Sequence, residues 1–348
     1  MNKKPVCRKQ YLKKNIKHLD PSGISDIQSL LQAFNHTSFQ SRNLGACYEV
    51  YLSMLKDKKT TILLGLSGAL IPAGMKKILT TMIERRLIDV LVSTGANLSH
   101  DFYESMGYKH YEGNPGVDDS KLYELKIDRI YDTYADDIKF SQTEQYFTQF
   151  PSQLENRSYS SREFFAEVGK RITMADSLLK TAFDNDVPIF CPALNDSVIG
   201  IGLTGYYIKG KNKNFHINPI RDNYEIMQIV KKSKSTGVIY LGGGVPKNYI
   251  QQIPPMLSTF GNEFKGHKYA VQITTDDPKW GGLSGCTFDE AKSWGKLTCN
   301  SNNATVYIDA TIGLPLLVNA VLPNYLSHKR RVQKYVWSYD KLLRVEYE

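Results

Sequence analysis

Six short apolar runs, with helical patterns between most of them, constrain the fold of this chain more than any other feature. They lie at residues 61–66, 89–94, 187–192, 237–241, 269–274 and 304–309. Strands that are apolar along their whole length are buried on both faces, and their alternation with helices is typical of a parallel sheet. We therefore expect the α/β class, with a Rossmann-like parallel sheet and helices on both of its faces.

Small and acidic residues follow these runs, close to where each strand is expected to end. They are Ser67-Gly68, Thr94-Gly95, Asp196, Gly242–Gly244, Thr275-Asp276 and Asp309. The carboxyl ends of parallel strands meet at one edge of the sheet, where glycines let a phosphate approach backbone amides at helix N-termini. Each glycine alone is more simply a turn residue, but their recurrence predicts a nucleotide site. Neither a GxGxxG fingerprint nor a Walker motif is present, so an ordinary dinucleotide or ATP site is not indicated.

Helical patterns suggest how the chain is divided. Residues 1–57 are predicted to be a helical N-terminal extension, because apolar residues recur at helical spacing between Ile27 and Leu55. Residues 58–348 are then expected to form a single α/β domain. Within this domain we expect helices at about 72–86, 161–185, 223–232 and 314–322. The polar section at 103–159 is rich in tyrosine and too poorly periodic for a specific prediction.

Charge and cysteine content limit the partners and the cellular setting. The 348 residues carry a net charge of +9, which favours anionic partners, but the basic residues are scattered, so nucleic-acid binding is not expected. The five cysteines form no CxxC pair and no histidine cluster has zinc spacing, so we expect no metal site. Without a signal peptide or an apolar run long enough to cross a bilayer, the chain is expected to be soluble, cytoplasmic and without a membrane partner.

The stretch of residues 280–296 carries the most specific chemistry. Three glycines in five positions near its start allow close backbone approach, and Thr287 with Glu290 has the spacing of a helix capping box. The short helix ends at Gly295 and is followed by Lys296. Packing of that lysine would disfavour its ammonium form, and the neutral amine can attack a carbon–nitrogen double bond or a carbonyl group. The alternative is an ordinary lysine that points into water.

Five segments, taken together and in this order, resemble the deoxyhypusine synthase family in its bacterial and archaeal form. They are Asp89–Thr94, Pro192-Ala193-Leu194 with Asp196, Leu241–Val245, Ser293-Trp294-Gly295-Lys296 and Tyr307–Ala310. The similarity runs from about residue 31 to the last helix and so covers nearly the whole chain. It implies a sirtuin-related NAD fold, assembled as a homotetramer with active sites at dimer interfaces.

The resemblance also implies a reaction that uses NAD and a polyamine and is redox-neutral overall. In that family NAD accepts a hydride from spermidine, and the resulting imine passes its 4-aminobutyl group to a lysine. The group then moves to an acceptor amine, and the NADH formed earlier reduces the product. For this chain the acceptor would be a translation-factor lysine or a free diamine such as putrescine, which would give homospermidine.

Roles for individual residues follow from the same resemblance. Lys296 matches the imine-forming catalytic lysine, Trp294 matches a tryptophan of the polyamine tunnel, and Glu290 matches a carboxylate that anchors an amine. The polyamine site would also include Gly281, Gly282 and Asn248. The positions that match NAD contacts are Gly68, Ala69, Thr94, Gly95, Asp196, Gly243, Thr275, Asp276, Asp309 and Ala310.

Several positions depart from the eukaryotic members of that family. Those enzymes carry a histidine where this chain has Asn248, and a glutamate where it has His100. They carry acidic residues at the positions of Trp280, Leu283 and Ile201. Candidates to supply the missing charges are Asp101, Asp276 and Asp277.

Two other functions stay open. A catalytically degraded relative would bind NAD, or only assemble with partners, without transferring a group. A sirtuin-like deacylase is less well supported, because the sequence has no zinc ribbon and no matching histidine motif, and His100 is more simply a structural residue. Cys286 and Cys299 flank the site and are expected to be buried spectators, because no neighbouring histidine offers a base.

Overall fold

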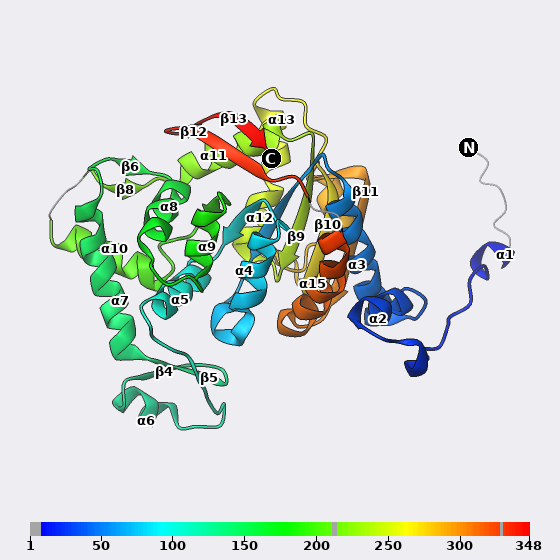
Figure 1. Ribbon diagram of the computed structural model, residues 1–348, viewed down its shortest axis with the longest axis horizontal. Coiled ribbons are helices and arrows are strands. Elements are labelled where there is room, and N and C mark those ends of the chain that lie inside the picture. The colour runs from blue at the N-terminus through cyan, green and yellow to red at the C-terminus, as the bar shows by residue number, and fades with distance from the viewer. Residues whose placement is uncertain (1–7, 211–213, 328–329) are drawn as a thin grey trace.

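Six parallel strands form the central sheet of the computed structural model, which describes residues 8–210, 214–327 and 330–348 (Figure 1). The strands are β1 (Thr60–Leu66), β2 (Val90–Ser93), β7 (Ile189–Phe190), β9 (Ser235–Leu241), β10 (His267–Thr274) and β11 (Leu297–Tyr307). They lie in the order β11-β10-β9-β1-β2-β7, and every neighbouring pair is parallel. Successive strands are therefore added in one direction from β1 and in the opposite direction from β9, three on each side, so the strand order reverses between these two strands, as in doubly wound folds. The predicted Rossmann-like α/β sheet is confirmed.

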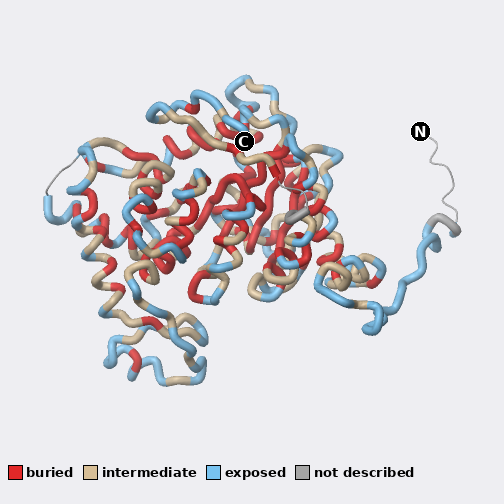
Figure 2. The backbone as a smooth tube through the Cα atoms, viewed as in Figure 1, coloured by how far each residue is buried: buried red, intermediate tan, exposed pale blue. Residues whose placement is uncertain are grey.

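Helices bury the two faces of the sheet in separate cores. In β1, Ile62, Leu64 and Leu66 pack into the larger core, while Leu63 packs into the smaller one, because successive strand side chains point to opposite faces. Helices over the larger core include α3 (Phe39–Lys56), α4 (Lys76–Glu84), α5 (Gly95–Ser105) and α15 (Ala310–Ser327). Those over the smaller core are α11 (Pro219–Lys232), α12 (Gly244–Gln251), α13 (Ile253–Thr259) and α14 (Phe288–Ser293). Figure 2 shows the strands between these layers as largely buried.

The long section around β7 is mostly helical. Its helices are α6 (Asp119–Glu124), α7 (Asp137–Gln149), α8 (Ser161–Arg171), α9 (Leu178–Asp184) and α10 (Val198–Ile208). The single helix expected at 161–185 is wrong, because the chain leaves α8 at Ile172 and starts α9 again at Ser177. Buried Asp101 fixes that second start by accepting hydrogen bonds from the Leu178 and Leu179 N–H groups at 2.7 and 2.9 Å.

A small antiparallel sheet, which the sequence periodicity did not predict, projects from the body beside α6 (Figure 1). Its strands are β3 (Tyr111–Glu112), β5 (Thr133–Asp136) and β4 (Ile127–Ile130), in that order. We call residues 111–138, which include α6 and these strands, the protrusion.

The two ends of the described chain differ in how they join the body. Helix α3 follows α2 (Ile27–Phe34) and buries Cys47, Tyr48 and Tyr51 in the larger core, whereas residues 8–19, including α1 (Arg8–Tyr11), extend away as an arm (Figure 1). At the other end a hairpin of β12 (Gln333–Ser338) and β13 (Lys341–Tyr347), missed by the sequence analysis, covers the smaller core.

The remaining elements are short. They are η1 (Pro21–Gly23), η2 (Ile71–Met75), η3 (Phe150–Gln153), η4 (Pro278–Trp280), β6 (Ser158–Tyr159) and β8 (His216–Ile217). The three other expected helices are present with shifted ends, as α4, α11 and α15. None of the helices in the described ranges is long and apolar enough to cross a lipid bilayer.

Candidate active site

The loops that follow β1 and β9 meet where the strand order reverses. The Ser67 hydroxyl in the first loop donates a hydrogen bond to the Gly243 carbonyl in the second. Open α/β sheets bind their ligands in the crevice at such a reversal, outside the carboxyl ends of the strands. Because all six strands are parallel, the predicted strand-end residues lie along this one edge.

The first turn of α5 holds the loop after β1 in shape. The Asn97 side chain accepts a hydrogen bond from the Leu70 N–H at 2.8 Å and donates to the Gly68 carbonyl at 2.9 Å. The Thr94 hydroxyl donates to the same carbonyl at 2.8 Å. The structure therefore brings together four of the residues expected at the cofactor: Gly68, Ala69, Thr94 and Gly95.

The other expected cofactor positions follow further strands of the same sheet. Asp196, Thr275 and Asp309 are exposed there, Asp276 and Ala310 are half-buried, and Gly243 is buried. Asp309 also caps α15, because its Oδ1 accepts the Thr311 N–H at 2.8 Å. The edge thus combines small loop residues with solvent-accessible carboxylates.

The end of α14 positions Lys296. Gly295 has a φ of +70°, and the N–H groups of Gly295 and Lys296 donate to carbonyls in the last turn of α14 at 3.0 and 3.1 Å. These two bonds make a Schellman motif, for which glycine is the usual residue because it carries no Cβ. The glycine ends the helix as predicted, and the chain then enters β11 directly after the lysine.

The Lys296 side chain is buried, with 9% of its surface exposed. Its Nζ donates to the Asn248 Oδ1 at 3.2 Å and lies 5.6 Å from the centre of the Trp294 ring. Lys296 itself precedes β11, at the amino end of the sheet. Asn248 belongs to α12, which begins at the carboxyl edge with Gly244, so that one helical turn, about 5 Å, separates this amide from the strand-end loops.

A buried lysine that the sequence analysis missed lies beneath this site. Lys247 is 1% exposed, and its Nζ donates to the Gln272 Oε1 at 2.9 Å and to the Cys286 and Ser284 carbonyls at 2.6 and 3.3 Å. Burial, with a smaller contribution from the nearby Lys296, lowers the pKa of Lys247 to about 8. The available signal was its spacing from Ile250, three residues later on the buried face of α12.

Gln272 and Ser284 complete this buried layer. The Gln272 Nε2 donates to the Ser284 and Gly242 carbonyls at 2.7 and 2.8 Å, and the Ser284 hydroxyl accepts the Gly244 N–H at 3.0 Å. The loops approach so closely that a Cβ on Gly243 would lie 2.3 Å from the Ser284 Cα. We call Lys247, Gln272, Ser284 and Gly243 the floor of the site.

Exposed side chains surround the site on its open side. Trp294 and Trp280 are 65% and 70% exposed, and Leu283 is also exposed. Glu290 is exposed in the first turn of α14, where Thr287 accepts its N–H at 3.1 Å, as the predicted N-cap requires. The loop glycines Gly281 and Gly282 are exposed as well. We call Trp280, Leu283, Glu290 and Trp294 the rim of the site.

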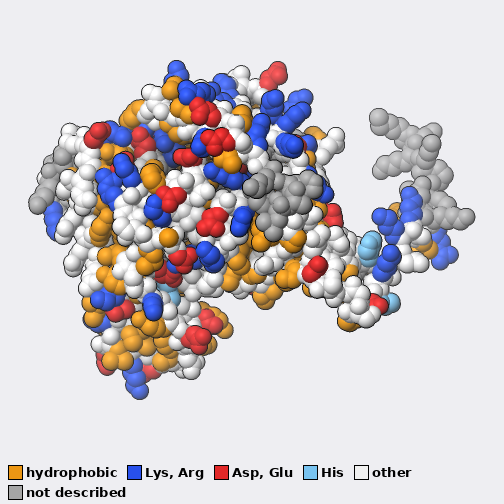
Figure 3. Space-filling model, viewed as in Figure 1, with side chains coloured by type: hydrophobic (Ala, Val, Ile, Leu, Met, Phe, Trp, Pro, Cys, Tyr) orange, Lys and Arg blue, Asp and Glu red, His pale blue; other side chains and the backbone are white. Residues whose placement is uncertain are grey.

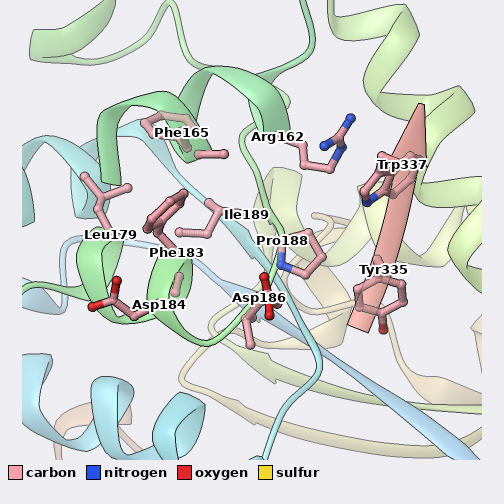
Figure 4. A pocket seen from close by; sticks show the side chains of 13 residues that line it. Arg162, Phe165, Leu179, Phe183, Asp184, Asp186, Pro188, Ile189, Tyr335 and Trp337 are labelled. Carbon is pink, nitrogen blue, oxygen red and sulfur yellow. The ribbon is translucent and has the colours of Figure 1, made fainter. Parts of the chain in front are cut away.

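A groove of about 580 Å³ continues from Asn248 along α12 and α13. Its wall includes Val245, Phe260 and Leu283, and no residue that lines it is charged. Another cavity, of about 410 Å³, lies between α8, α9, β7 and β12, with Arg162, Phe183 and Trp337 in its wall (Figure 4). That cavity contains none of the predicted site residues.

Two of the three candidates for the missing charges are already engaged. Asp101 is fully buried and accepts three hydrogen bonds, from the Ser177 hydroxyl and two N–H groups of α9, so its expected role at the site is wrong. Asp277 caps η4 and pairs with Lys279 at 2.9 Å. Asp276 is half-buried next to the glycine loop.

The histidine and the cysteines near the site have structural explanations. His100 is buried with its Nδ1 2.9 Å from the His110 Nε2, and burial lowers the pKa of His100 to about 4. The simpler structural reading of His100 agrees with this packing. Cys286 is half-buried, so the prediction of a buried thiol holds there only in part, and Cys299 is exposed, so the prediction is wrong there.

Fold and site together define a doubly wound α/β protein with a ligand edge at the strand reversal and two buried lysines beside it. A sequence model of the family described as "Deoxyhypusine synthase" matches residues 29–321. The chain belongs to the deoxyhypusine synthase family, a family of transferases.

Individual relatives agree with this assignment. A protein of Methanosarcina mazei named "Probable deoxyhypusine synthase 2" is 44% identical over 325 residues, which cover 92% of this chain and 94% of the relative. The "Deoxyhypusine synthase-like protein" of Coxiella burnetii is 37% identical over 321 residues, covering 90% and 91%. The crystal structure of the Entamoeba histolytica protein described as "a putative deoxyhypusine synthase" aligns with a TM-score of 0.59 at 18% identity, covering 94% of this chain and all of that one, and so supports the fold.

Proposed function

We propose that this protein is an NAD-dependent transferase that moves a 4-aminobutyl group from spermidine, through Lys296, to an acceptor amine. The observation that carries the proposal is the setting of Lys296. Its amine is buried, held by the Asn248 amide and close to an aromatic ring, and one turn of α12 joins it to the ligand edge of the sheet.

The edge of the sheet suits NAD. A Cβ on Gly68 would meet nothing within 4 Å, so this loop faces open space beside the reversal point. The exposed carboxylates of Asp196 and Asp309 can accept hydrogen bonds from ribose hydroxyls, and the N-terminal ends of α5 and α12 favour phosphate. NAD, when bound, would take up a hydride from the polyamine and return it to the final product.

The step assigned to this chain is an exchange of amines at Lys296. Its neutral amine forms a bond to the imine carbon of the oxidised polyamine, and the bond to the departing 1,3-diaminopropane nitrogen breaks as that nitrogen takes up a proton. The 4-aminobutyl group is then held on Nζ as an imine, until the acceptor amine displaces the lysine in the same way. Asn248 can orient Nζ, but an amide side chain cannot take its proton.

The rim supports an active site that is completed by a second copy. Trp294 can hold an ammonium group against its face and Glu290 can pair with one, yet both are exposed in a single chain. A homotetramer with sites at dimer interfaces would cover them. The acceptor is either a small diamine such as putrescine or the lysine of a translation factor.

The test is to trap the amine exchange. After incubation with NAD and spermidine, borohydride reduction should leave an aminobutyl adduct on Lys296, located by peptide mass spectrometry. Lys296→Ala should form no adduct and lose at least ~10³-fold in turnover, as for loss of a nucleophile. Lys292→Ala is the matched control, because that lysine lies on α14 and pairs with Asp289 at 2.8 Å.

An adduct on another lysine, or undiminished turnover in Lys296→Ala, would contradict the proposal. Thermal stabilisation by NAD without any adduct would favour the catalytically degraded relative. Labelled spermidine, offered together with putrescine and with a hypusine-type translation factor, would identify the acceptor.

A further inference from the structure

The protrusion has the most concentrated negative charge that we find on the chain. Residues 111–138 contain eight acidic and three basic residues, although the whole chain has a net charge of +9. Within the described residues, one ion pair of the protrusion is formed, between Arg129 and Asp119 at 2.6 Å. Burial and the neighbouring carboxylates of Asp137 and Asp136 raise the pKa of Asp128. Most carboxylates of the protrusion therefore have no basic partner in the part of the chain that the structure describes, and those around Asp128 lie close to one another.

The same surface is apolar. Large side chains that are exposed on it are Tyr111, Tyr123, Leu125, Tyr131 and Ile138. Figure 3 shows hydrophobic side chains gathered at this part of the molecule, at the lower left, with acidic side chains beside them. A group of exposed aromatic and aliphatic side chains on one small element is typical of an interaction surface.

The N-terminal arm has the opposite charge and also exposes apolar side chains. Residues 8–19 contain five basic residues and no acidic residue. Its exposed apolar side chains are Tyr11, Leu12, Ile16 and Leu19. One hydrogen bond, from the Lys17 N–H to the His36 carbonyl at 2.9 Å, joins residues 8–19 to the rest of the described chain. The described basic and apolar side chains of the arm are therefore left exposed by its own body.

We propose that the N-terminal arm of one copy of this chain docks on the protrusion of a second copy. Lysines of the arm then meet unpaired carboxylates, and its apolar side chains meet the exposed tyrosines. The arm cannot serve its own protrusion, because it leaves the body on the opposite side of the molecule and points away (Figure 1). The groove beside Asn248 suits the arm less well, since its lining offers no charge to pair with the lysines.

Charge reversal tests the contact from both sides. Lys13→Glu, Lys14→Glu and Lys17→Glu together should abolish slow amide exchange in residues 8–19 and speed exchange in the protrusion, as followed by mass spectrometry of the full chain. Glu112→Lys, Glu124→Lys and Asp132→Lys should do the same, and the two sets combined should restore protection. Raised salt should weaken the parent contact, because exposed charge pairs are screened.

The matched control reverses three exposed lysines that lie outside the arm, Lys58, Lys59 and Lys265, and should leave the exchange of both segments unchanged. A photoreactive residue at Tyr11 gives the second readout, in a mixture of isotopically light and heavy copies. Its cross-links should join the arm of one copy to residues 111–138 of another. Cross-links within one copy, cross-links to residues 245–283, or protection unaffected by charge reversal would overturn the proposal. None of these readouts depends on catalysis, so they stand apart from the trapping experiment at Lys296.

Discussion

The floor and the rim of the site meet at Leu283 and Ser284, which are neighbours in sequence, but the two parts differ in how far one chain completes them. In the floor, Lys247 and Gln272 are buried and make five hydrogen bonds between them to the surrounding loops and to each other. In the rim, Trp280 and Trp294 present most of their surface to solvent. The floor is therefore a property of the single fold, whereas the rim is a surface available to a substrate or to another copy.

Substitution of a glycine tests this difference most strongly. Gly243→Ala should cost about 3 kcal/mol of unfolding free energy, because the added Cβ would lie 2.3 Å from the Ser284 backbone and overpacking costs ~1–3 kcal/mol or more. Gly281→Ala in the rim loop is the matched control. Its Cβ would meet nothing, so only its φ of +68° opposes it, at about 1 kcal/mol. Urea unfolding of both variants measures the pair, and equal losses would remove the distinction between floor and rim.

Lys247→Met should be somewhat less costly. It keeps the length of the side chain but leaves the Cys286 carbonyl and the Gln272 Oε1 without their donor, at about 1–3 kcal/mol. The variant should also loosen the glycine loop and reduce turnover. Hydrogen exchange of residues 280–287 would show this change, and Lys292→Met, at a half-buried position on α14, should not.

The Lys247→Met variant should also change how the stability of the protein depends on pH. The pKa of Lys247 is lowered to about 8 from 10.5, so between these values the unfolded chain binds a proton that the folded chain lacks. The stability of the parent protein should therefore rise with pH from 8 to 10.5, and Lys247→Met should lack this contribution. Chemical unfolding at several pH values gives the difference between the two slopes. Parallel slopes would mean that Lys247 keeps its ordinary titration in the fold.

Rim substitutions should have the smallest effect on folding. Trp280→Ser and Leu283→Ser should change the unfolding free energy by no more than ~0.5 kcal/mol, as is usual for exposed positions. If a second copy covers the rim, the same changes should weaken self-association about tenfold or more, which is 1.4 kcal/mol. Analytical ultracentrifugation measures this, with Phe39→Ser as an exposed control in α3. Unchanged self-association of the two variants would mean that the rim contacts substrate and not a second copy.

Much of this architecture follows from local chemistry that a sequence displays. Strands that are apolar along their whole length predict a sheet that is buried on both faces. Gly295 predicts the end of α14, because few other residues adopt its left-handed backbone conformation. The parallel arrangement then carries the strand-end residues to one edge. These are features in which neighbours along the chain determine the outcome.

The misses share a different physical origin. In the sequence, nothing distinguishes Lys247 from a surface lysine, because the Ser284 and Cys286 carbonyls that bind it are distant along the chain. In the same way, nothing distinguishes Asp101 from an exposed carboxylate, because the N–H groups of α9 that it binds lie more than 70 residues later. The strands of the protrusion are only two to four residues long, too short to show a periodic pattern, and β3 pairs with β5 more than 20 residues later. In each case tertiary contacts, which leave no periodic trace, decide the environment of the side chain.

Helix α12 sets the distance between the strand-end edge of the sheet and the amide that holds Lys296. Its first residue belongs to the loop at the strand reversal, and the amide that holds Lys296 follows one turn later. Adding one residue to it would swing that amide by about 100° and advance it by ~1.5 Å, away from the lysine. Loops around the opening can change, while the pitch of this single helix keeps the spacing between the strand-end edge, where we propose that NAD binds, and the Lys296 amine.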